Sequence, residues 1–152
     1  LDLKEDGMET LLFIGKGDLR KVINCLQITS MSNPNTQLTA ACIFLNLGLP
    51  LPAEMQSIFH QLMEDSFEKA FKELRSLQKE KGYSVDNIVS ALYQLVLAID
   101  WPNTVIMQLV ARLADIEERL SFGASEEIQL AALVSSFVNV RHDLHQLKKI
   151  LK

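Results

Sequence analysis

A lysine between two glycines, followed by an aspartate and an arginine, is the first feature of the sequence that could do chemistry. The stretch reads IGKGDLRKVINCLQ, residues 14–27. A Walker A loop needs GxxxxGK[ST], but Gly17 follows Lys16 where Ser or Thr should stand, and Thr10 occupies the first glycine position. We therefore expect that Lys16 does not bind a β-phosphate in the manner of that loop.

The helix start that follows offers a second kind of anion site. Asp18 can cap a helix, and Arg20 then lies in its first turn, where the helix dipole favours negative charge. A guanidinium group can bind a phosphate through two parallel hydrogen bonds. The pattern alone favours an exposed Arg20 without a role, and an anion contact is the alternative.

A cluster of acidic residues could also do proton chemistry. Asp115, Glu117 and Glu118 lie close together on one expected helix. Arg112 and Arg119 stand at helical spacing from them, and this pattern is typical of a salt-bridged helix surface. We favour that interpretation over acid–base catalysis. No Ser or Cys has the local signature of a nucleophile, so we predict no catalytic residue.

The histidines and cysteines do not predict a metal site. His142 and His145 are three residues apart, but a metal site needs three or four ligands. Cys25 and Cys42 lie in apolar helical patterns without a CxxC motif, which predicts buried, reduced thiols. The C-terminal segment is basic through Arg141, His142, His145, Lys148, Lys149 and Lys152. Cations that complement the helix dipole are favoured there over a phosphate-binding patch.

Almost every segment follows the helical period, and none alternates with period two over the length of a strand. Residues that begin helices precede several segments, namely Asp18, Thr36 or Thr39, Ser84 and Ser125, and Pro102 is expected in the first turn of its helix. Helices are predicted at about 6–14, 18–31, 36 or 39 to 47, 52–63, 66–80, 84–99, 102–120 and from 125 onward. The sequence thus predicts an all-α fold.

The last helix carries a seven-residue repeat of apolar side chains. We call its members the heptad residues: Leu130, Phe137, Leu144 and Leu151 form one row, and Leu133, Val140 and Leu147 form the other. Such a narrow a/d seam is typical of helices that pack on helices of another chain. Any amphipathic core helix gives a partial match, so a core helix and an interface are both open. Leu130, Leu133, Phe137, Val140, Leu144 and Leu151 are our candidate interface residues.

Length and composition set broad limits on the protein. The chain has 152 residues, of which 48% are hydrophobic and 22% charged, as in ordinary soluble domains. The net charge of −4 does not favour nucleic-acid binding by the chain as a whole. The most apolar run, residues 38–53, is too short and interrupted to span a membrane. Because the chain begins with Leu1, we expect a C-terminal fragment.

Two stretches resemble motifs of one family, the small subunits of replication factor C, the eukaryotic sliding-clamp loader. GDLRKVINCLQ (17–27) resembles the sensor-two segment of the AAA+ lid domain, usually written GDMRxxxNxLQ, with Leu19 in place of Met. ADIEERLSFGASEEIQL (114–130) resembles the family's collar motif. The DWP triplet at 100–102 leans toward the subunit group numbered five in the human complex.

The resemblance implies a domain organisation and a set of partners. Residues 1–35 would end the lid domain, 36–51 would form a linker helix and turn, and 52–152 would form a collar of about five helices. The collar would join the other clamp-loader subunits, and no membrane is expected. Contacts with the sliding clamp and with primer–template DNA would come mainly from AAA+ domains outside this chain. The localisation would be nuclear, with roles in DNA replication and repair.

The resemblance also gives Arg20 a role. It would be the sensor-two arginine, which reaches the γ-phosphate of ATP bound in the preceding AAA+ domain. The Walker motifs lie outside this sequence, so we expect no enzyme activity and no cofactor here, with ATP and Mg²⁺ bound only by the intact subunit. The alternative function is a helical-bundle adaptor that binds other proteins and is unrelated to clamp loading.

Overall fold

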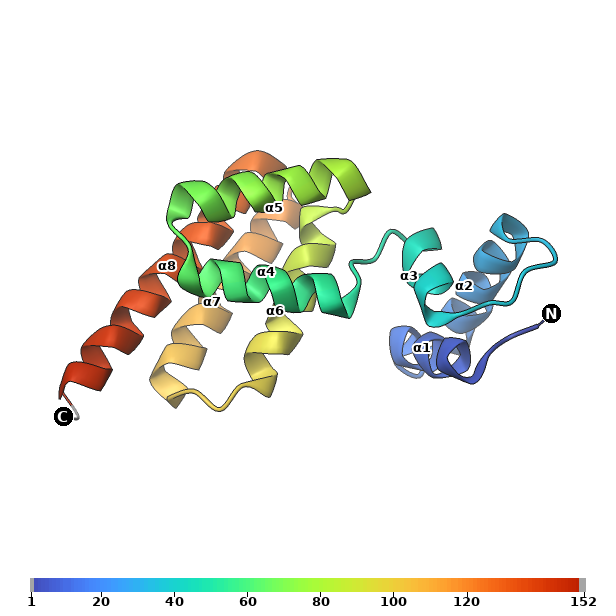
Figure 1. Cartoon of the computed structure of the whole chain (residues 1–152), viewed down its shortest axis with the longest axis horizontal. Helices are drawn as coiled ribbons and strands as arrows, with labels where there is room; N and C mark the ends of the chain where they lie inside the picture. The colour runs from blue at the N-terminus through green and yellow to red at the C-terminus, as the bar shows by residue number, and fades with distance from the viewer. Residues whose placement is uncertain (1, 151–152) are drawn as a thin grey trace. The chain divides into compact units, whose positions relative to one another are not determined.

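Eight α-helices and no strand make up the part of the chain that the structure describes, which confirms the predicted all-α class. The structure is a computed structural model that describes the backbone of residues 2–150 and the side chains of residues 2–144. The chain divides into two compact units, Leu1–Leu51 and Pro52–Lys152, which we call unit 1 and unit 2 and describe separately (Figure 1).

Unit 1 consists of three short helices, α1 (Glu5–Gly15), α2 (Leu19–Ser32) and α3 (Ala40–Asn46). Its small core is formed by Leu11, Ile14, Cys25 and Ile43. An isolated parallel bridge between Leu3 and Leu38 ties the segment before α1 to the segment before α3. We had predicted residues 36–51 as a linker helix and turn. In the structure, α3 packs against α1 and α2, and its Ile43 is fully buried.

Unit 2 is a bundle of five helices. They are α4 (Pro52–Glu64), α5 (Phe67–Lys81), α6 (Val85–Ala98), α7 (Asn103–Ser121) and α8 (Glu126–Ile150). Figure 1 shows α8 beside the other helices of the bundle, and it contacts each of the four. The core contains apolar side chains from every helix, because each helix turns its apolar stripe inward.

Local capping chemistry explains where several helices begin. The side chains of Asp18, Thr39 and Ser84 each accept a hydrogen bond from a backbone N–H in the first turn of the helix that follows. Our prediction for Pro102 was wrong by one position. It precedes α7 as the N-cap, with an extended ψ of 133°, and Asn103 is the first helical residue.

Candidate functional site

The turn between α1 and α2 is built for a close approach of the two helices. A Cβ on Gly15 would clash with Val22 Cγ2, so a larger residue there would require the Val22 side chain to move. Lys16 and Gly17 both have positive φ angles, 49° and 87°, which reverse the chain within two residues. The N–H of Asp18 donates to the Gly15 carbonyl at 2.9 Å and closes the turn. The direction in which α2 begins is therefore fixed by this turn.

Asp18 holds the start of α2 through its side chain. Its Oδ1 accepts hydrogen bonds from the N–H of Arg20 at 2.9 Å and from the N–H of Lys21 at 3.2 Å. Arg20 is consequently the second residue of α2, and its side chain is exposed. Among the described residues, no hydrogen bond or ion pair engages its guanidinium group. The structure thus presents Arg20 as an available cation at a helix start.

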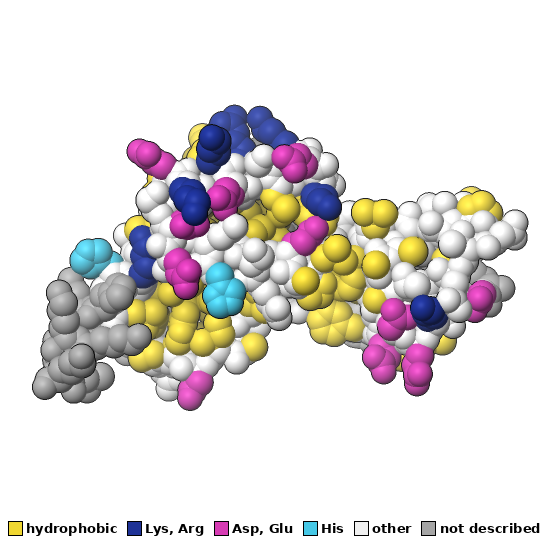
Figure 2. All heavy atoms as spheres, viewed as in Figure 1, with side chains coloured by type: hydrophobic (Ala, Val, Ile, Leu, Met, Phe, Trp, Pro, Cys, Tyr) yellow, Lys and Arg dark blue, Asp and Glu magenta, His cyan; other side chains and the backbone are white. Residues whose placement is uncertain are grey.

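The surface of α2 around Arg20 is unusually apolar for an exposed helix face. Leu19, Ile23 and Met31 are 69%, 54% and 74% exposed. Helical spacing puts them on the same side as Arg20, opposite the buried Cys25. Figure 2 shows hydrophobic side chains at the surface of this unit. The helical period groups Leu19 and Ile23 with Val22 and Leu26 on one apolar face of this helix, but in the structure only Val22 and Leu26 pack against the core of unit 1, and Leu19 and Ile23 are exposed.

The heptad residues that the structure describes lie in the interior of unit 2. Leu130, Leu133 and Phe137 are 0% exposed and Val140 is 1% exposed, while Leu144 is half-buried against the same core. Phe137 meets Phe59 of α4 edge to face, with ring centroids 5.8 Å apart. The side chain of Leu147 and the whole of Leu151 lie outside the described residues. The core-helix interpretation accounts for the four buried positions, and contact with a neighbouring chain stays a prediction.

Other apolar side chains of unit 2 are exposed; the helical period places one of them, Phe67, inward, and the sequence reasoning missed the others. They are Phe67, Tyr93, Leu97, Met107, Phe122 and Ile128. Phe122 and Ile128, at 83% and 66% exposed, stand on either side of the α7–α8 turn. Packing within the bundle explains the buried apolar stripe of each helix, but it does not explain apolar residues outside that stripe. The exposed apolar side chains are therefore the positions that a partner could cover.

The acidic cluster on α7 lies on an exposed surface. Asp115, Glu117 and Glu118 are all exposed, as are Arg112 and Arg119. We had expected ion pairs among these five residues. That expectation was wrong, because none of the ion pairs between described side chains involves any of the five. Those pairs join Lys69 to Asp65, Arg75 to Glu127 and Lys81 to Glu54. Within the described residues, no group of three His, Cys, Asp or Glu could hold a metal ion.

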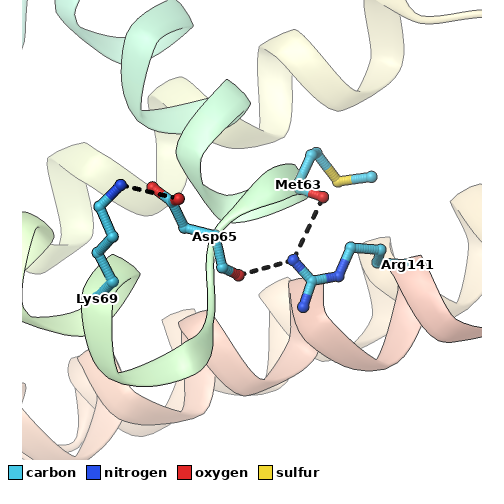
Figure 3. Close-up of polar contacts among 4 residues, drawn as sticks. All are labelled: Met63, Asp65, Lys69 and Arg141. Atoms are coloured by element: carbon cyan, nitrogen blue, oxygen red, sulfur yellow. Dashed lines mark hydrogen bonds and ion pairs between the residues drawn. The ribbon is translucent and has the colours of Figure 1, made fainter.

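Arg141 has a structural partner inside the bundle. Its Nη1 donates to the carbonyl oxygens of Met63 at 3.3 Å and Asp65 at 2.7 Å, at the C-terminal end of α4 (Figure 3). The side chain of Asp65 pairs with Lys69 at 2.9 Å and raises the pKa of that lysine. We had assigned Arg141 to a basic cluster that complements the end of its own helix. Instead it caps a different helix, 76 residues earlier in the sequence.

The two thiols of unit 1 differ in their surroundings. Cys25 is buried, as predicted, but Cys42 is only half-buried, and both are free. The Thr39 hydroxyl donates a hydrogen bond to Cys42 Sγ at 3.4 Å and holds the pKa of this thiol below its usual value. We therefore expect the thiol of Cys42 to react with electrophiles faster than the buried thiol of Cys25.

Comparison with known proteins identifies the family. A family model described as the replication factor C C-terminal domain matches residues 50–136. The probable replication factor C subunit 5 of Dictyostelium discoideum is 37% identical over 136 residues, which cover 90% of this chain and 39% of that protein. Replication factor C subunit 3 of Oryza sativa subsp. japonica is 35% identical over 141 residues, covering 93% of this chain and 38% of that protein. Subunit 5 of Mus musculus is 34% identical over 144 residues, covering 95% and 42%.

The matches cover most of this chain but less than half of each relative. The chain spans about two fifths of the length of the curated relatives. The matched domain begins close to the start of unit 2 and includes most of its helices. No helix in the described part of the chain is long and apolar enough to cross a membrane. An unrelated adaptor is not favoured by this match, and the chain belongs to the replication factor C C-terminal domain family.

Proposed function

We propose that this chain is the C-terminal part of a small subunit of a sliding-clamp loader and that unit 2 assembles it with the other subunits. The observation that carries the proposal is the family match over residues 50–136, which falls almost wholly on unit 2. Two of the three relatives reported above are named subunit 5 and the other subunit 3, and the names thus support subunit 5 as the equivalent of this chain. The intact complex would load a clamp onto primer–template DNA with ATP in the nucleus, during replication and repair.

The exposed apolar side chains of unit 2 are the proposed contacts with neighbouring subunits. Phe122 and Ile128 at the α7–α8 turn, and Met107 on α7, would lose most of their exposed apolar surface in an assembly, and each square ångström buried contributes about 25 cal/mol. Leu144, half-buried at the end of the heptad row, is a further proposed contact. The fully buried heptad residues would support assembly indirectly, by holding the bundle together.

Capture of the other loader subunits by the tagged chain tests this proposal. Ile128→Glu should weaken capture, because a charge would replace an apolar contact. Ser135→Glu is the matched control, since it adds the same charge to an exposed position of the same helix. Full capture by the Ile128 variant would remove this face from the proposed interface, and no capture by the unchanged chain would refute the assembly function.

Arg20 is proposed to sense the terminal phosphate of ATP in the intact subunit. Three features of unit 1 support this role: the guanidinium is exposed, it has no partner among the described residues, and it stands at a helix start. The apolar face around it would then pack against another domain of the longer protein. ATP and Mg²⁺ would be held by that domain, so this chain contributes a cation rather than the catalytic machinery.

Turnover of ATP by the assembled loader tests the sensing role. Arg20→Ala in the intact subunit should lower the turnover number without changing the mass of the complex. Arg112→Ala, which removes another exposed arginine from α7, should leave both quantities unchanged. A turnover number for Arg20→Ala equal to that of the unchanged complex would contradict the role.

A further inference from the structure

The carboxylate of Asp18 fills the site that a helix start normally offers to an anion. Its Oδ1 accepts from two first-turn amides of α2, those of Arg20 at 2.9 Å and Lys21 at 3.2 Å. Free N–H groups at this position are what commonly bind phosphate at helix starts. Here these two donors are already used, and the group that uses them is itself negatively charged.

Asp18 is also held on its backbone side. Its N–H donates to Gly15 O at 2.9 Å, and its carbonyl accepts from Val22 N–H at 3.1 Å. One residue therefore connects the α1–α2 turn to the first turn of α2 through three groups: its amide, its carbonyl and its carboxylate. The turn contains two consecutive residues with positive φ, so the cap is what joins this unusual backbone to a regular helix.

The orientation of Arg20 depends on this cap. Among the described residues, nothing contacts its guanidinium through a hydrogen bond or ion pair, so no side-chain partner orients it. Its own N–H is bonded to Asp18, two residues before it. The cap therefore fixes the position of the Arg20 backbone and the direction of its Cα–Cβ bond, from which the side chain extends.

We propose that Asp18 is a positioning residue for Arg20, which fixes the first turn of α2 and makes the guanidinium, rather than the helix amides, the group of α2 that meets the terminal phosphate. This inference rests on the proposed sensing function of Arg20. It adds that recognition by α2 is a side-chain contact whose geometry is set by a carboxylate, and that this carboxylate keeps phosphate away from the amides.

Amide hydrogen exchange measured by NMR on the 152-residue chain tests the cap without any activity assay. Asp18→Ala should speed exchange of the Arg20 and Lys21 amides about fivefold or more. Asp18→Asn should keep both amides protected, because asparagine caps a helix about as well as aspartate. Equal exchange in the unchanged chain and the alanine variant would overturn the proposed cap.

Nucleotide binding and turnover by the intact subunit, assembled with its loader partners, test the positioning role. Asp18→Ala should lower the turnover number for ATP about fivefold and reduce the preference for ATP over ADP, with a smaller change in KM. Asp18→Asn should restore turnover to within about twofold of the unchanged complex. The double variant Asp18→Ala, Arg20→Ala should be no slower than Arg20→Ala alone, because both changes remove the same contact.

A second cap in unit 1 provides the matched control. Thr39 caps α3, accepting from Cys42 N–H at 3.4 Å, so Thr39→Ala removes a cap of the same unit and leaves the Asp18 cap of α2 in place. It should leave turnover and nucleotide preference unchanged. The positioning role is overturned if Thr39→Ala slows turnover as much as Asp18→Ala does. It is also overturned if Asp18→Ala keeps normal turnover while Arg20→Ala is slow. Normal turnover by Arg20→Ala would instead refute the sensing function itself.

Discussion

Replacing Phe137 by alanine should strongly destabilise unit 2 even when no partner is present. The ring is completely buried and packs edge to face on Phe59, with centroids 5.8 Å apart. Truncation of a buried phenylalanine costs about 3–5 kcal/mol, because burial and contacts are lost and a cavity remains. A domain of this size has a free energy of unfolding of about 5–15 kcal/mol, so the variant would lose a large share of it.

Urea unfolding followed by tryptophan fluorescence measures this loss in unit 2 specifically. The chain has one tryptophan, Trp101, and its ring lies 5.8 Å from the ring of Phe59. With a urea dependence of about 2 kcal/mol per molar, a loss of about 4 kcal/mol would lower the midpoint by about 2 M. Phe122→Ala is the matched control, since it removes the same ring from a position that is 83% exposed. That change should alter stability by about 0.5 kcal/mol or less.

The two phenylalanine variants separate a core role from an interface role for the heptad residues. An unchanged midpoint for Phe137→Ala in the isolated chain would contradict the packing described above. A larger loss of stability for Phe122→Ala than for Phe137→Ala would also contradict that packing. A combined Leu130→Glu, Phe137→Glu variant could not make this distinction, because charges at two fully buried positions would unfold the bundle.

Two further predictions concern other contacts. Arg141→Met should lower the free energy of unfolding of unit 2 by about 1.5–3 kcal/mol, because charge-assisted hydrogen bonds to the end of α4 are lost. Urea unfolding measures this loss, and Arg112→Met, which replaces an exposed arginine, is the control. Equal midpoints for the two variants would contradict the prediction. Cys42 should react with iodoacetamide faster than an ordinary thiol at pH 7.5, because a lowered pKa enlarges the thiolate fraction at that pH, and its rate should fall as the pH drops through that pKa. Thr39→Val should slow the reaction while Thr39→Ser preserves it, as mass spectrometry of the alkylated protein can measure, and equal rates in both variants would exclude the hydroxyl as the cause.

Local chemistry made much of the fold predictable. Asp18, Thr39 and Ser84 cap helices as expected, because a cap involves only a side chain and the next few backbone amides. The apolar stripes of the helices likewise predicted an all-α fold. Pro102 was misplaced by one residue because the first turn and the cap position both tolerate a residue without an N–H donor.

Contacts between distant residues were beyond the reach of sequence patterns. The seven-residue repeat marked the buried side of α8, but it could not tell whether the helices packed there belong to the same chain. Arg141 looked like part of a basic helix end, although its partners lie on another helix. In the same way, the short helix at 40–46 was predicted as a linker, because only tertiary packing reveals that Ile43 completes a core with α1 and α2.

The candidate sensor was predicted from a motif rather than from physical pattern alone. Spacing placed Arg20 in the first turn of a helix, but it could not exclude an exposed residue without a role. The structure adds the capped turn, the absence of a partner for the guanidinium among the described residues, and the apolar face around it. These surroundings could not be predicted from the motif, because they depend on how α1 and α3 cover the opposite side of α2.

The light-scattering mass of the chain, alone and after co-expression with the C-terminal domains of the other clamp-loader subunits, tests whether unit 2 assembles with them. We expect a defined hetero-complex that contains the chain in a fixed ratio to its neighbours, since unit 2 matches the family's C-terminal domain. The same mass for the chain in the presence and absence of every one of those domains would contradict the proposed assembly function.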